Sequence, residues 1–173
     1  MAILDEIRSN SITTLHLSTD PDDIYGSTKE FVDALEKNES IEEVVFDKDF
    51  IACIYGNERG DILEAVALLP NLHSVKLADA CLMVSFMSQM TKLAKGLRSF
   101  TLDKIVLQGV QSDFDAFEAA LMQHGNLKEF HMNDCITAND GLDMEKIVKA
   151  GKNITKTSLG EPSKQISKSA IAA

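Results

Sequence analysis

An acidic run, DPDDIYG at residues 20–26, carries carboxylates of the type that bind calcium. An EF-hand loop counted from Asp20 requires glycine at its sixth position and glutamate at its twelfth, but Tyr25 and Phe31 stand there. We therefore interpret the run as a solvated turn whose acidic residues favour the start of a following helix. A looser site built from oxygen ligands is the alternative.

A second pair with chemical potential is His131 and Cys135, since a histidine near a cysteine is typical of a base and a thiol nucleophile. Apolar residues alternate around His131, which indicates a strand with His131 on its exposed face. Cys135 follows that strand where the chain turns inward, so we expect a buried and unreactive thiol. His16 takes the equivalent position four strands away, roughly 19 Å from His131 at normal strand spacing. That separation is too large for a shared metal ion.

Motifs for phosphate binding and hydrolysis are missing from the sequence: there is no glycine-rich phosphate loop, no GxSxG and no HExxH. We therefore predict that the chain is not an enzyme and that it uses no cofactor and no metal. The formal net charge of −10 disfavours nucleic-acid binding, which requires a basic surface.

The expected location of the chain rests on its termini and its cysteines. No apolar run is long enough to span a membrane, and the N-terminus has no visible secretion signal. Cys53, Cys81 and Cys135 are odd in number and form no CxxC pair, which favours reduced thiols over a disulfide framework. We expect a cytoplasmic protein or one of an organelle interior.

One pattern recurs through the chain: an apolar residue, two variable ones, an apolar, one variable, and an apolar. Its copies ITTLHL, IEEVVF, LHSVKL, LRSFTL and LKEFHM start at residues 12, 41, 72, 97 and 127, and a weakened sixth copy, ITKTSL, starts at residue 154 with Thr157 in place of an apolar residue. The alternation within each copy predicts a strand with one buried face. Each of the first five copies is followed by apolar residues at helical spacing: Phe31, Ala34, Leu35; Ile62, Ala65, Val66, Leu69; Phe86, Met90, Leu93, Ala94; Phe117, Ala120, Leu121; and Met144, Ile147, Val148.

Capping residues mark the ends of the expected helices. Ser27 with Glu30, and Asp61 with Glu64, predict two helix starts. The expected helix ends lie at Asn38, Asn71, Gly96, Gly125 and Gly151. A strand and a helix repeated about every 28 residues can bury their apolar faces by stacking on the next copy.

The repeated pattern resembles the leucine-rich repeat family in its ribonuclease-inhibitor-like class, whose motif is LxxLxLxx(N/C)xL followed by a helix. The resemblance implies an α/β solenoid of about five to six repeats over residues 12–159, with parallel strands on the concave face and helices on the convex face. Residues 1–11 would form an N-terminal cap, and residues 160–173 a tail that is disordered or docks on a partner. The Asn/Cys position holds cysteine only at Cys135, so we expect irregular turns in the other copies, where it is Asp20, Asp49, Ala80 and Ile105.

The exposed strand positions form the expected binding surface. They are mostly small or polar, and they include charges of both signs. The candidate partner-binding residues on this face are His16, Glu43, Val45, Asp47, Ser74, Lys76, Ser99, Thr101, Asp103, Glu129, His131 and Asn133.

The resemblance implies a non-enzymatic protein–protein interaction module, or a peripheral scaffold subunit of a larger assembly. Residues 1–64 hold 16 acidic and 5 basic residues, whereas residues 65–173 hold 11 and 12. The acidic end therefore predicts a protein partner with a basic surface, contacted by Asp22, Asp23, Glu42 and Glu43. The alternatives are a regulator of an enzyme, similar to a small-GTPase activator, and an actin-capping repeat domain.

Overall fold

The computed structural model describes residues 3–17, 27–47, 57–138, 144–151, 154 and 156–159; for residues 57–59 and 156–159 it describes the backbone alone. The acidic run with Asp22 and Asp23, the thiol of Cys53 and the expected tail 160–173 lie outside these residues.

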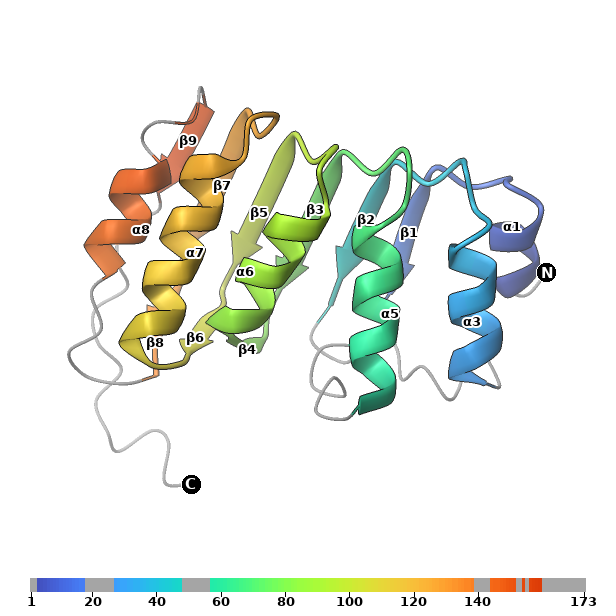
Figure 1. The fold of residues 1–173 in the computed structure, drawn as a ribbon, viewed down its shortest axis with the longest axis horizontal. Coiled ribbons are helices and arrows are strands. Elements are labelled where there is room, and N and C mark those ends of the chain that lie inside the picture. Colours follow the sequence, from blue (N-terminus) through green and yellow to red (C-terminus); the bar gives the residue numbers. More distant parts are fainter. Residues whose placement is uncertain are drawn as a thin grey trace.

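A parallel sheet of six strands runs through the described residues, and the strands are ordered as in the chain. Figure 1 shows them side by side from β1 to β9. Each strand begins at the third residue of a copy of the repeated pattern, so the pattern identified all six. The strands are β1 (Thr14–Leu17), β2 (Glu43–Phe46), β3 (Ser74–Ala78), β5 (Ser99–Asp103), β7 (Glu129–Asn133) and β9 (Lys156–Leu159).

Helices connect the strands and lie on one side of the sheet (Figure 1). Within strands β2, β3, β5 and β7, buried residues alternate with half-buried ones, so one face packs under the helices. The chain therefore has a mixed α/β fold with parallel strands. The helices are α1 (Ile3–Arg8), α3 (Thr28–Leu35), α5 (Asn57–Ala67), α6 (Val84–Leu93), α7 (Gln111–Gln123) and α8 (Met144–Gly151).

The predicted apolar faces of α3, α5 and α7 are buried in the core. The prediction for α6 was wrong in part, because Phe86 and Leu93 are only partly buried. Val84 and Met87 take the core position instead, each fully buried. Phe86 and Leu93 line a groove of about 160 Å³ between α5 and α6. The apolar residues of α6 cover about half of the helix circumference, so they include residues at the margin of the buried face as well as at its centre.

The turns after β3, β5 and β7 are regular, contrary to the prediction for the copies with Ala80 and Ile105. Each turn contains a residue with positive φ, namely Asp79 (51°), Lys104 (54°) and Asp134 (50°). Backbone bonds tie successive turns together: Asp79 N donates to Asp103 O (2.9 Å), and Lys104 N donates to Asn133 O (2.8 Å). These backbone bonds connect the turns although Ala80 and Ile105 stand at the Asn/Cys position.

Short strands follow these three turns and form a second parallel sheet among the described residues, in the order β4-β6-β8. They are β4 (Cys81–Met83), β6 (Val106–Gln108) and β8 (Ile136–Thr137). These strands were not predicted, because each is too short to show an alternating pattern.

The two predicted helix starts have different outcomes. Ser27 caps α3, since its hydroxyl oxygen accepts a hydrogen bond from Glu30 N at 3.2 Å. Asp61 caps nothing, because α5 begins four residues earlier at Asn57. Glu58 and Arg59 have high helix propensity, which extends the helix by a turn ahead of Gly60.

Candidate functional site

The register of the large sheet aligns residues at alternate strand positions in rows, and those from β1 to β7 are half-exposed or exposed. One row joins Thr14, Glu43, Ser74, Ser99, Glu129 and Lys156. The next joins His16, Val45, Lys76, Thr101, His131 and Ser158. A third joins Ala78, Asp103 and Asn133. We call these rows the open face; the predicted face residues from His16 to Asn133 lie on it, except Asp47, which follows β2 directly.

Charges on the open face pair across neighbouring strands and along one strand. Lys76 Nζ lies 3.5 Å from Asp103 Oδ2, and His131 Nε2 lies 3.9 Å from Glu129 Oε2. Ser99 and Thr101 separate these two pairs with small hydroxyl side chains. The centre of the open face therefore consists of small and polar side chains.

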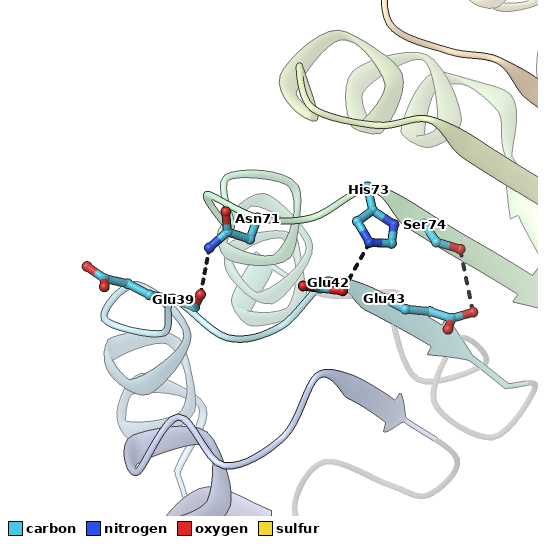
Figure 2. Close-up of polar contacts among 6 residues, drawn as sticks. All are labelled: Glu39, Glu42, Glu43, Asn71, His73 and Ser74. Carbon is cyan, nitrogen blue, oxygen red and sulfur yellow. Dashed lines mark hydrogen bonds and ion pairs between the residues drawn. The ribbon is translucent and has the colours of Figure 1, made fainter.

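The edge where the strands begin shows contacts that the sequence argument missed (Figure 2). His73 Nε2 lies 3.2 Å from Glu42 Oε2, and Ser74 Oγ donates to Glu43 Oε1 at 3.5 Å. Two of the four acidic residues predicted to meet a basic partner thus already contact groups of the chain itself. Because the residues in each pair are 31 positions apart, only the register reveals the contacts.

Three basic side chains lie in consecutive positions along the same edge. Arg98 N donates to His73 O, and Lys128 N donates to Arg98 O, both at 2.8 Å. We call His73, Arg98 and Lys128 the basic edge. Together with Ser99 and Glu129 they line a shallow depression of about 310 Å³. Each basic residue stands directly before a strand, at the second position of the repeated pattern, and that regularity was the available sequence signal.

The pair His131 and Cys135 is separated by the sheet. Cys135 is buried, with its sulfur 3.4 Å from Asn133 O and 3.6 Å from Leu102 O. Burial raises the pKa of the Cys135 thiol to about 11. His131 is half-exposed on the open face. The interpretation of Cys135 as a buried turn thiol is confirmed.

Because of Cys135, the free energy of unfolding should decrease as the pH rises in the alkaline range. The folded pKa is raised, so the native state retains the proton between the ordinary value near 9 and about 11. The free energy of unfolding should therefore decrease over that window by about 2–3 kcal/mol at most. Urea denaturation of the wild type and of Cys135→Ala at several pH values isolates the contribution, since other titrating groups are common to both. Parallel pH profiles in the two proteins would contradict it.

The described residues were also considered as ligands of a metal ion, as a membrane span and as a methionine-rich docking surface. No three His, Cys, Asp or Glu side chains there lie together in a way that could hold a metal ion. In the same part of the chain, no helix has the length and apolarity to cross a bilayer. The methionines after β3 do not form a common docking surface, because Met87 and Met90 are buried in the core while Met83 is exposed.

The chain was compared with known proteins. No protein-family model matches it, and no curated protein matches it with significant similarity.

Proposed function

We propose that the chain is a leucine-rich repeat solenoid of the ribonuclease-inhibitor-like class. Six parallel strands in chain order, a helix within most of the connections between them, and one face of the sheet under helices support this proposal. The start of each strand at the third residue of a copy of the LxxLxL pattern also supports it.

We further propose that the protein is a non-enzymatic interaction module, or a peripheral subunit of an assembly, and that its open face contacts another protein. The observation that carries this proposal is the alignment of mostly polar, half-exposed or exposed residues in rows across β1, β2, β3, β5 and β7. Small-molecule sites enclose most of their ligand. A broad face with mixed charges suits a protein surface instead, on which contacts are spread over many side chains.

Thr101→Arg tests this proposal at the centre of the open face. Thr101 is half-exposed in β5, between Lys76 and His131 in the same row. A long cation at that point would hold the partner's surface away from the open face and repel a neighbouring positive group. We therefore expect binding to weaken by about 100-fold. Affinity purification of the tagged protein from its native extract, followed by a binding titration with the recovered partner, measures the change.

The control for Thr101→Arg is Gln123→Arg, which places the same cation on an exposed residue at the end of α7, where a positive charge is favourable. Binding should survive in this control. Equal loss in both variants, or full binding by Thr101→Arg, would overturn the open face as the contact surface. A protein that stays monomeric in its extract and turns over a substrate would overturn the non-enzymatic proposal.

A further inference from the structure

The basic edge is unusual in a chain with 27 acidic and 17 basic residues. Three lysines of the described residues have carboxylate partners: Lys76 with Asp103, Lys104 with Asp79, and Lys146 with Asp115. Arg98 and Lys128 have no such ion pair within the described ranges. The two residues stand directly before adjacent strands, whose backbones lie about 4.8 Å apart in a sheet.

Two neighbouring cations repel each other, and an anion placed between them removes that repulsion. The guanidinium of Arg98 offers a planar fork of N–H donors, which matches a carboxylate with two parallel hydrogen bonds. Lys128 adds an ammonium group on one side of the depression, and the half-exposed Ser99 adds a hydroxyl group. We infer that the basic edge binds carboxylate side chains of an acidic segment in the partner protein. This inference rests on the proposed interaction function.

Carboxylates fit the basic edge better than more highly charged anions do. Glu129 lines the same depression, and its negative charge repels a doubly charged phosphate more strongly than a singly charged carboxylate. The partner segment therefore contacts the basic edge through glutamate or aspartate carboxylates.

The basic edge adds a second direction of charge attraction to the one expected from the sequence. The acidic first third of the chain led to the prediction of a basic partner surface. Glu42 and Glu43 contact His73 and Ser74, whereas Arg98 and Lys128 remain available to an external anion. The charge pattern at the edge of the sheet thus points to an acidic contact from the partner.

A fluorescein-labelled octaglutamate peptide is a suitable probe, with octaglutamine as its uncharged counterpart. At low salt, about 50 mM, we expect octaglutamate to bind the full chain and octaglutamine not to bind. Arg98→Gln/Lys128→Gln should weaken octaglutamate binding by about tenfold or more, because the variant removes two cations that would each pair with a carboxylate of the peptide. The side chains of both residues are exposed, so the fold should persist, and circular dichroism checks this.

The matched control is Lys29→Gln/Lys37→Gln, which removes the same two charges from exposed positions on α3 and directly after it. This variant should bind octaglutamate within about twofold of the wild type. Equal weakening in the two double variants would reduce the effect to overall charge and overturn the inference. Absence of octaglutamate binding to the wild type, or tighter binding of inorganic phosphate, would also overturn it.

The same variants separate this inference from the proposed function. A natural partner that is lost with Thr101→Arg but retained with Arg98→Gln/Lys128→Gln would overturn the carboxylate site alone. A partner that is retained with Thr101→Arg and lost with Arg98→Gln/Lys128→Gln would support the carboxylate site and place the contact at the edge instead of the open face.

Discussion

Phe100→Ala is expected to lower the free energy of unfolding by about 3–5 kcal/mol, the largest effect of any substitution considered for this protein. Phe100 lies in β5 and is fully buried. Its ring centroid is 6.3 Å from that of Phe117 in α7 and 6.1 Å from that of Phe130 in β7. The Phe117 and Phe130 centroids are 6.2 Å apart, so the three rings form one cluster between the sheet and α7. Alanine at this position leaves a cavity that the two remaining rings cannot fill.

Urea denaturation of wild type and variant measures the effect of Phe100→Ala. Phe86→Ala is the matched control, since the same atoms are removed from a side chain that is only partly buried. We expect the control to lose about 1–2 kcal/mol, because less apolar surface leaves water at Phe86. Domains of this kind are stable by about 5–15 kcal/mol, so the two losses are easily distinguished. Similar losses for the two variants would show that the ring cluster is not a tightly packed centre.

Asn38→Ala is expected to cost about 2–4 kcal/mol, which is much more than loss of a surface amide costs. Asn38 is a polar side chain with an exposed fraction of 1%, and it connects α1 with the start of β2. Its Nδ2 donates to Ile7 O at 2.8 Å, while its Oδ1 accepts from Ser40 N at 2.9 Å and from Ile41 N at 2.8 Å. Alanine would leave one carbonyl and two N–H groups without these partners.

The control for Asn38→Ala is Asn71→Ala, which removes the side-chain amide of an asparagine that stands just before the next motif copy. Asn71 is exposed, and its Nδ2 donates a single bond to Glu39 O at 2.6 Å (Figure 2). Water can replace that bond, so a loss of about 1 kcal/mol or less is expected. Thermal unfolding followed by circular dichroism compares the variants. A melting temperature for Asn38→Ala as high as that of Asn71→Ala would contradict the role assigned to the buried amide.

The strands were predictable from sequence because each one buries a single face. Leu15 and Leu17 are both fully buried, and His16 between them is exposed, so the period of two is visible in the residues. The open face followed directly, since the residues between the buried ones must point the other way. The buried face of α6 was harder to predict, because its apolar residues cover about half of the helix and the sequence does not identify which of them lie at the centre of that face.

The turns and the edge contacts depend on backbone geometry that side-chain types do not reveal. Lys104 adopts a positive φ although lysine has no special preference for it, and its N–H donates to Asn133 O. The basic edge likewise depends on which strand starts next to which. His73, Arg98 and Lys128 are 25 and 30 positions apart in sequence, and only the pairing of β3, β5 and β7 brings them into one line.

The order of the strands has a consequence for how the chain opens. Each pairing in the large sheet joins residues separated by between 25 positions (Ser74 to Ser99) and 31 positions (Glu43 to Ser74). The entropy lost on closing such a loop changes only slowly with its length, so every strand joins its predecessor at nearly equal entropic cost. Of the described strands, β1 and β9 have one neighbour in this sheet and the others have two. Amide hydrogen exchange should therefore begin at the two ends and reach β3 and β5 last.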